Sequence, residues 1–145
     1  MATFSASVDA WVRKTKQRST AVWRESAERI VEIVQTPGPS VANPDADAGG
    51  HMPVEFGHLR ASIQASLTGQ VAPFRENPGR TVSYDPSAVS LVIANAQLGD
   101  VITVSYGAIY ARIMEERYAF VGLAAQRWSK VVADVSAEAK RRAGG

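Results

Sequence analysis

The chain has 145 residues, 46% of them hydrophobic and 21% charged, which suits a single globular domain. Its net charge of +2 is too small for bulk attraction to a polyanion, so nucleic-acid binding would need a local basic patch. The absence of cysteine excludes disulfides, cysteine nucleophiles and thiolate metal sites. No apolar run reaches the roughly 18 residues of a membrane span, and the N-terminus lacks the apolar segment of a signal peptide. We therefore expect a chain made in the cytoplasm, with no membrane partner.

Residues 6–35 are predicted to form one long amphipathic helix, because apolar residues recur there at steps of three and four. Ser5 or Ser7 could cap its start, and the sequence TPGP at 36–39 should end it. At 1.5 Å per residue such a helix is about 45 Å long, which is more than a domain of this size needs. We expect it to project from the domain or to pack along neighbouring subunits.

The N-terminal half of this helix carries our candidate interface. Its polar face is basic, which is typical of a solvated surface and also of a contact with nucleic acid or an acidic partner. The three tryptophans, Trp11, Trp23 and Trp128, all fall on or beside apolar helix stripes, so they are expected in the core. Trp11, at the free end, could instead serve as an interface anchor. The possible interface residues are Trp11, Arg13, Lys14, Lys16 and Arg18.

Residues 36–54 are predicted to form an irregular loop or arm, because they contain four prolines and three glycines. This arm could become ordered on docking with another protein. A short helix is expected at 57–67, where apolar residues again recur at steps of three and four. Residues 88–94 and 101–106 are expected to form a β-hairpin, since both are rich in β-branched side chains, with a possible third strand at 80–84.

A short helix or turn at 110–117 and a long helix at 119–141 complete the chain. The predicted fold class is α+β, with a small antiparallel sheet, a hairpin plus a possible third strand, packed by long N- and C-terminal helices and a short middle helix. Residues 1–145 are expected to form a single domain.

The histidine-containing stretch at 51–58 is the first candidate for chemistry. His51, Glu55 and His58 could suggest a metal site, but a zinc site needs three or four converging ligands and these are the only histidines. We expect His51 in the loop and His58 exposed or partly packed on a helix. The chain has no GxSxG elbow, no P-loop and no GxGxxG motif. These observations favour a protein that is not an enzyme and has no cofactor and no metal.

Two blocks of the sequence resemble a known family. Residues 53–63, PVEFGHLRASI, resemble the P-V-D-T-G-x-L-R-x-S-I signature of tailed-bacteriophage head–tail joining (tail-completion, neck) proteins. Residues 110–115, YARIME, resemble the Y-A-x-x-x-E motif of that family. The chain departs from the pattern at Glu55-Phe56, where the family has Asp-Thr, and at Arg117, where a glycine is usual. The motif residues are Pro53, Gly57, Leu59, Arg60, Ile63, Tyr110, Ala111 and Glu115.

The resemblance covers roughly residues 50–130 and implies a structural virion component. Such proteins form rings, commonly hexamers, around the DNA channel at the junction of capsid and tail. The implied partners are further copies of the chain, the adjacent adaptor, stopper and tail-tube proteins, and DNA that passes through without specific binding. The implied location is the virion, assembled in the cytoplasm of the host bacterium. Candidates for a channel lining are the acidic residues Asp45, Asp47, Glu76, Asp85 and Asp100.

The motif residues also have a physical interpretation. Gly57 should let the chain turn into the helix where a Cβ would clash, and Leu59 and Ile63 should seat that helix on the sheet. Arg60 could pair with Glu115 or with a neighbouring subunit.

Two other functions stay open. One is a nucleic-acid-binding module that uses the basic N-terminal helix and the C-terminal residues Lys140–Arg142. The other is an enzyme with a metal or hydrolytic site at His51, Glu55 and His58.

Overall fold

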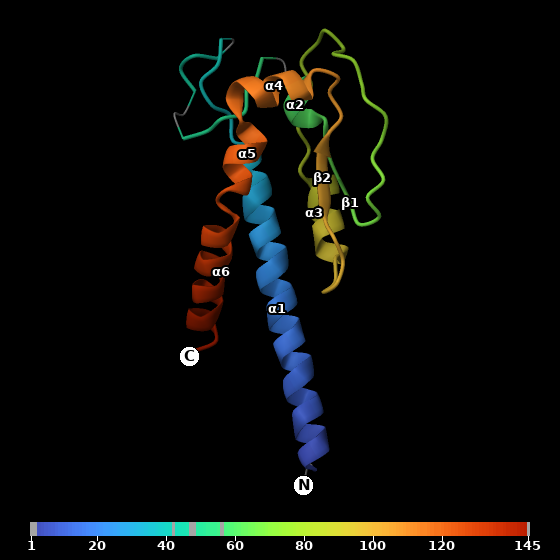
Figure 1. Ribbon diagram of the computed structural model, residues 1–145, viewed down its shortest axis with the longest axis vertical. Helices are drawn as coiled ribbons and strands as arrows, with labels where there is room; N and C mark the ends of the chain where they lie inside the picture. The colour runs from blue at the N-terminus through green and yellow to red at the C-terminus, as the bar shows by residue number, and fades with distance from the viewer. Residues whose placement is uncertain (1–2, 42, 47–48, 56, 145) are drawn as a thin grey trace.

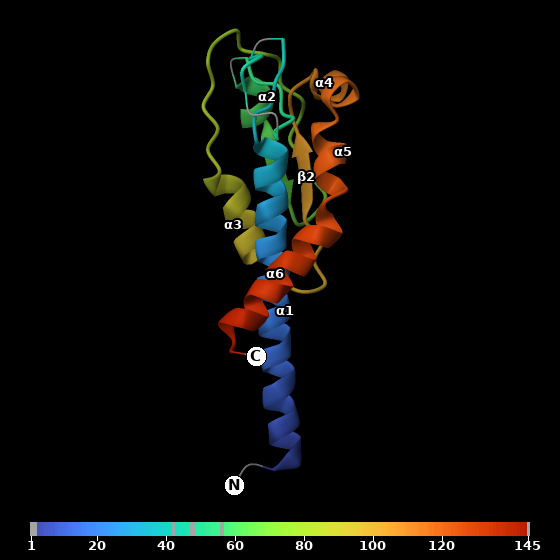
Figure 2. The same cartoon turned by 90° about the vertical axis from the view of Figure 1, so that its left-hand side faces the viewer.

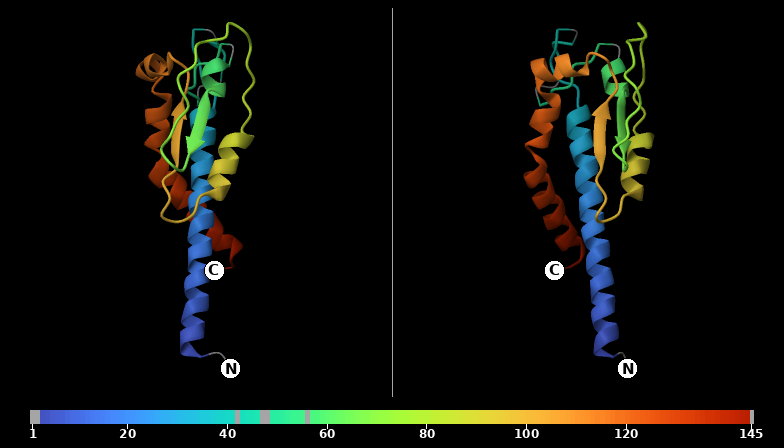
Figure 3. Two further views of the ribbon diagram at one scale, coloured as in Figure 1. Left: turned by 90° about the vertical axis from the view of Figure 1, so that its right-hand side faces the viewer. Right: turned by 45° about the vertical axis from the view of Figure 1, so that its right-hand side comes forward.

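The structure is a computed structural model that describes residues 3–41, 43–46, 49–55 and 57–144. Helix α1 runs through the middle of the molecule, with α5 and α6 on one side and the sheet and α3 on the other (Figure 1; Figure 3). The predicted α+β class is confirmed. In chain order the elements are α1 (Phe4–Gln35), α2 (His58–Ala61), β1 (Ile63–Ser66), α3 (Ser87–Asn95), β2 (Thr103–Tyr106), α4 (Ala111–Tyr118), α5 (Phe120–Ala125) and α6 (Trp128–Arg142).

Helix α1 confirms the predicted long N-terminal helix, and at 32 residues it is about 48 Å long. Its cap is Thr3, whose Oγ1 accepts a hydrogen bond from the Ala6 backbone N–H at 3.1 Å. Ser5 and Ser7 therefore lie inside the helix and do not cap it. The helix ends at Thr36, directly before Pro37, because a residue that precedes proline is disfavoured in the α conformation.

The predicted hairpin is wrong, because the sheet pairs β2 with β1 and not with residues 88–94. The two strands are antiparallel, with Ile63 opposite Tyr106 and Ser66 opposite Thr103. Strand β2 confirms the second predicted strand, but β1 lies where the helix at 57–67 was expected. Helix α2 is only one turn long. The sequence Ile-Gln-Ala-Ser of β1 alternates apolar and polar residues, so it suits a strand once a partner is beside it.

Residues 88–94 belong to helix α3, so the prediction of a strand there is wrong. Val89, Ile93 and Ala96 are buried, at helical steps of four and three. Asp85 Oδ1 accepts a hydrogen bond from the Ser87 backbone N–H at 3.0 Å and, with Pro86, starts the helix. A short apolar run suits a strand or a helix equally, and here the start signal outweighs the β-branched composition. Residues 80–84, which the structure describes throughout, form no third strand.

The C-terminal third contains a helix at 110–117, as predicted, in the form of α4. The single helix expected at 119–141 is wrong, because two helices, α5 and α6, take its place and meet at Gln126 and Arg127. The Arg127 backbone N–H bonds to the Ala124 carbonyl at 3.0 Å, which tightens the turn between them. After this turn α6 crosses α1 obliquely (Figure 2).

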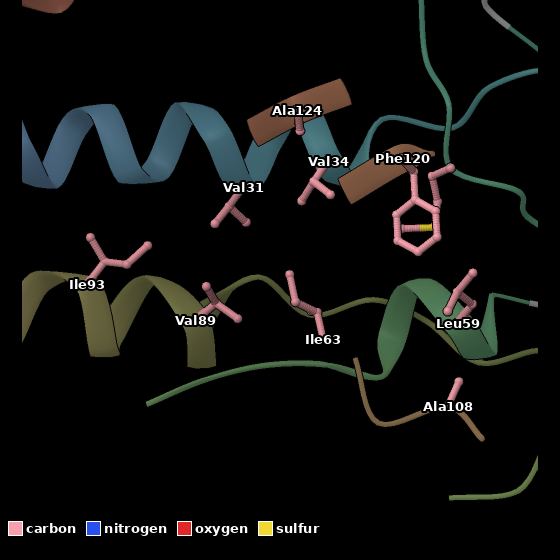
Figure 4. Close-up of a cluster of buried hydrophobic side chains, with 10 residues drawn as sticks. Val31, Val34, Leu59, Ile63, Val89, Ile93, Ala108, Phe120 and Ala124 are labelled. Carbon is pink, nitrogen blue, oxygen red and sulfur yellow. The ribbon is translucent and has the colours of Figure 1, made fainter. Parts of the chain in front are cut away.

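The hydrophobic core lies between α1 and α5 on one side and α2, β1 and α3 on the other (Figure 4). Leu59 and Ile63 are both buried in it. Leu59 lies on α2 and packs that helix against the core, as predicted, but Ile63 belongs to strand β1, so its predicted role in seating a helix on the sheet is wrong. Its members are Val31, Val34, Met52, Leu59, Ile63, Val89, Ile93, Ala108, Phe120 and Ala124. All of them follow residue 30, so the N-terminal half of α1 has no part in this core. Among the described residues, no helix is both long enough and apolar enough to cross a membrane.

Candidate functional site

Gly57 makes the turn from the 36–54 arm into α2. Its φ of +83° lies in the left-handed region that favours glycine. A Cβ built on Gly57 would lie 2.3 Å from the carbonyl oxygen of Val82. The interpretation of Gly57 as a position that admits no side chain is confirmed. Its neighbour Phe56 lies outside the described residues.

His58 is buried, which corrects the expectation of an exposed or partly packed side chain. Its Nε2 lies 3.3 Å from the Arg75 carbonyl oxygen, and its ring centroid lies 5.8 Å from that of Tyr110. His51 and Glu55 are exposed. Among the described residues, no group of three or more His, Cys, Asp or Glu side chains is placed to hold a metal ion. Of these three residues, only His58 is packed inside the fold.

Arg60 ties α2 to the C-terminal end of α1. Its Nε donates to the Gln35 carbonyl oxygen at 2.9 Å, and Gln35 Nε2 donates to the Arg60 carbonyl oxygen at 2.9 Å. The guanidinium also stacks on Tyr84, 5.0 Å from the ring centroid. Tyr106 donates its hydroxyl proton to Gln35 Oε1, and burial raises the pKa of Tyr106. The predicted pairing of Arg60 with Glu115 is wrong, because both side chains are engaged elsewhere.

Glu115 holds the corner between α4 and α5. Its two carboxylate oxygens accept hydrogen bonds from the backbone N–H groups of Val121 and Gly122, at 2.8 and 2.9 Å. These N–H groups belong to the first turn of α5, where no other partner exists within the helix. Ala119 makes the turn with a φ of +51°, an uncommon conformation for a residue with a Cβ. The motif glutamate therefore acts as the cap of the following helix.

Tyr110 and Ala111, the other two residues of the second motif, pack beside the first motif. Both are half-buried against the hydrophobic core. Burial raises the pKa of Tyr110, partly offset by a hydrogen bond with the backbone of Leu59. Two blocks that are distant in the sequence thus form one structural unit at the end of the molecule where α2 and α4 meet (Figure 1).

A cavity of about 620 Å³ lies beside this unit, and Pro53 lines it together with His58 and Tyr110. Glu55 and Arg117 line the same cavity. The sequence departs from the head–tail joining pattern at both of these positions. The structure therefore brings the departures together at one place, which the sequence spacing does not reveal.

The candidate interface residues lie on the projecting half of α1, which we call the α1 shaft (residues 4–19). Arg13, Lys14, Lys16 and Arg18 are all exposed. Trp11 is 67% exposed, so its expected place in the core is wrong and it is free for an interface. Phe4 and Val8 are 86% and 40% exposed and share a helix face with Trp11, since the three follow at steps of four and three. The α1 shaft therefore presents an apolar stripe that none of the other described residues covers.

A groove between α1 and α6 was not expected from the sequence. We call it the α1–α6 groove; its volume is about 790 Å³. Much of its wall is apolar, including Trp128, whose side chain is 38% exposed, and Ser19, Glu25 and Ser136 also line it. Its rim brings Arg18 together with Lys140 and Arg142, from the two basic segments noted separately in the sequence. The sequence feature that could have indicated this groove is the presence of an apolar stripe on each of the two long helices. The walls include Val22, Trp23, Trp128, Val132 and Ala139.

Ion pairs hold α6 against α1 beside this groove. Arg29 pairs with Glu138 and, at 3.1 Å, with Glu25. Arg142 also pairs with Glu25, at 3.1 Å. The hydrogen bond from Arg29 lowers the pKa of Glu138. All these side chains are part-exposed, so they orient the two helices more than they stabilise them.

The acidic residues proposed for a channel lining are scattered on the surface. Asp45, Glu76, Asp85 and Asp100 are exposed. Asp47 lies outside the described residues. A search for related proteins adds no further constraint: no protein-family model, no curated protein and no solved structure matches this chain. The function is therefore argued from the chain's own motifs and geometry.

Proposed function

We propose that this chain is a structural component of a tailed-bacteriophage virion that forms a ring at the head–tail junction, around the DNA channel. The observation that carries the proposal is the meeting of the two blocks that resemble the head–tail joining family. His58 of the first block packs 5.8 Å from Tyr110 of the second, and Leu59 lies in the core that Tyr110 contacts. Motifs that fold into one unit are expected where the resemblance reflects a shared architecture.

The bonds made by the motif residues favour a structural role over an enzymatic one. Both carboxylate oxygens of Glu115 accept backbone hydrogen bonds, which occupies the group that could act as a base. The polar groups of Arg60 and His58 likewise bond to backbone carbonyls. Polar side chains whose partners are backbone groups of the same chain build the fold, and we propose that the protein is not an enzyme.

The α1 shaft supports self-assembly. An exposed tryptophan flanked by other large apolar side chains is costly to leave in water and is typical of an interface anchor. A ring needs such contacts between unlike surfaces of neighbouring copies. We propose that the partners are further copies of the chain, commonly six, then the adaptor, stopper and tail-tube proteins. The place of the protein is then the virion.

Mass and symmetry in solution test this proposal. We expect multi-angle light scattering to give a closed oligomer of the 15.5 kDa chain, with a hexamer at six times that mass. Negative-stain images should show rings with a central hole. A strict monomer over the micromolar range, which also stays monomeric when neck and tail proteins are added, would contradict the proposal.

A second candidate is a nucleic-acid-binding module, favoured by one observation. The α1–α6 groove places Arg18 beside Lys140 and Arg142, so the two basic segments meet at one rim, which stays net positive although Glu25 pairs with Arg142. Binding that depends on this rim should weaken steeply with salt, because each neutralised phosphate releases counterions. Absence of duplex DNA binding at about 50 mM salt would dispose of this candidate, whereas a ring protein needs only weak contact with DNA.

A further inference from the structure

The α1 shaft and the α1–α6 groove are two apolar surfaces of the same chain that no other described segment covers. The stripe on the shaft consists of Phe4, Val8 and Trp11. The groove walls include Val22 and Trp23 of α1 and Trp128 and Val132 of α6. The stripe projects as a ridge and the groove is concave, so their shapes are complementary.

The stripe cannot enter the groove of its own molecule. Both lie on α1, which is a single unbroken helix from Phe4 to Gln35. From Val8 to Val22 this helix rises about 21 Å, and it has no internal proline, glycine or bend at which it could fold back. Figure 1 shows the shaft continuing in a straight line beyond the C-terminal end of α6. An occupant that comes from this chain must therefore come from a second copy.

Charge selects which part of the shaft suits the groove. Residues 4–12 contain one charged side chain, Asp9, which is acidic. Arg18, Lys140 and Arg142 line the groove rim as cations. Glu25, which also lines the groove, pairs with Arg142, and the charge of the rim remains net positive. The following stretch, residues 13–18, contains four cations and would be repelled by that rim. Apolar complementarity and charge complementarity thus both point to residues 4–12.

We propose that residues 4–12 of α1 in one copy dock into the α1–α6 groove of a second copy, with Trp11 as the anchor against Trp23 and Trp128. This inference deepens the proposed function and rests on its self-assembly, since it names the contact between subunits. The contact joins unlike surfaces, so it closes either as a reciprocal pair or as a ring. The measured mass distinguishes the two.

Cysteine cross-linking tests the contact directly, because the chain has no cysteine of its own. Ser7 lies beside the stripe, and Ser136 lines the groove. The variants S7C and S136C, mixed and oxidised, should form a disulfide-linked heterodimer. The matched control replaces S136C by A137C, which is on the same helix and exposed outside the groove. Equal heterodimer yields from S136C and A137C would overturn the proposal.

Substitution of the anchor gives a second measurement. Trp11→Ala should raise the concentration at half-assembly by about tenfold or more, as expected for an aromatic hot spot. Leu91→Ala is the control, because Leu91 is 64% exposed on α3, away from both surfaces. Far-ultraviolet circular dichroism should report the same fold for both variants.

The outcomes separate the two proposals. Oligomers that persist in Trp11→Ala without selective cross-linking would overturn this contact and leave the ring proposal standing. A wild-type chain that is monomeric throughout would overturn both.

Discussion

The α1 shaft differs from the rest of the molecule in how far its apolar side chains are buried. We call the described residues from Thr20 onward the packed body. In the body, apolar side chains of α1 such as Val31 and Val34 are 5% exposed, because α5 and α3 cover them. In the shaft the same helix continues without a covering layer, and Phe4 and Trp11 are exposed. A helix in water gains most of its stability from packing, and the proposed contact with a second copy would supply that packing to the shaft.

The two regions differ in what surrounds their apolar side chains, since those of the body pack in its own core and those of the shaft are exposed. The body builds its own core and satisfies its motif residues internally, through Arg60 with Gln35 and Glu115 with α5. The shaft contributes nothing to that core, yet it is built of the same amphipathic helix. A change in the body should therefore reduce stability, whereas a change in the shaft should reduce association.

The largest expected difference comes from truncating one aromatic residue in each region. Phe120→Ala should lower the free energy of unfolding by about 3–5 kcal/mol, since Phe120 is 2% exposed in the core. Trp11→Ala should change the free energy of unfolding of the monomer by no more than about 0.5 kcal/mol. Urea denaturation at a concentration where light scattering shows monomers measures both. A loss of several kcal/mol in Trp11→Ala would show that the shaft is part of the folding unit.

The next largest expected effect is a difference in stability loss between two glycine substitutions in the body, one at Gly57 of the motif and one at the turn residue Gly69. Gly57→Ala should cost more than about 2 kcal/mol, because left-handed strain adds to a clash with the Val82 carbonyl. Gly69→Ala has a similar φ of +78° but nothing within 4 Å of the added Cβ, so it should cost only about 1 kcal/mol. Equal losses of unfolding free energy in the two variants would mean that the close approach of the Val82 carbonyl to Gly57 adds no measurable destabilisation.

The smallest expected effect is a pH dependence of stability, due to the ion pair between Arg29 of α1 and Glu138 of α6. Arg29 lowers the pKa of Glu138 below its ordinary value of 4.5, so this carboxylate stabilises the folded state above about pH 4.5. The stabilisation is lost as the pH falls through the lower folded pKa. Glu138→Gln should therefore lower Tm at pH 7 and lower it by less at pH 3, where more of the wild-type carboxylate is protonated.

The matched control for this pH effect is Glu116→Gln. Within the part of the chain that the structure describes, Glu116 pairs only with Arg112 of the same helix, at 3.5 Å, and both side chains are largely exposed. This variant should show almost no difference in Tm from wild type at either pH. A Tm difference for Glu138→Gln that is as large at pH 3 as at pH 7 would exclude the ion pair as its cause.

Local signals in the sequence predicted the features that depend on neighbouring residues. The turn at Gly57 is one, because its positive φ is a local backbone requirement that favours glycine, whereas the close approach of the Val82 carbonyl depends on the tertiary structure. The end of α1 before Pro37 is another. By contrast, the partner of β2 could not be predicted from proximity in the chain. Residues 88–94, which were expected beside β2, form helix α3. Strand β2 pairs instead with β1, whose last residue, Ser66, lies 37 positions before Thr103. The cap made by Glu115 depends on the left-handed turn at Ala119, which carries no glycine signal.

The sequence by itself determined that α1 is long, amphipathic and basic along its first half, because helical periodicity and its stop signals are written in consecutive residues. Only the tertiary structure decided which part of that helix is covered. The apolar stripe is continuous, but α5 and α6 reach only its C-terminal half, so Val31 is buried and Trp11 is exposed. The crossing of α6 over α1 also created the groove beside Trp23 and Trp128. Burial depends on elements that are distant in the chain, and periodicity cannot specify them.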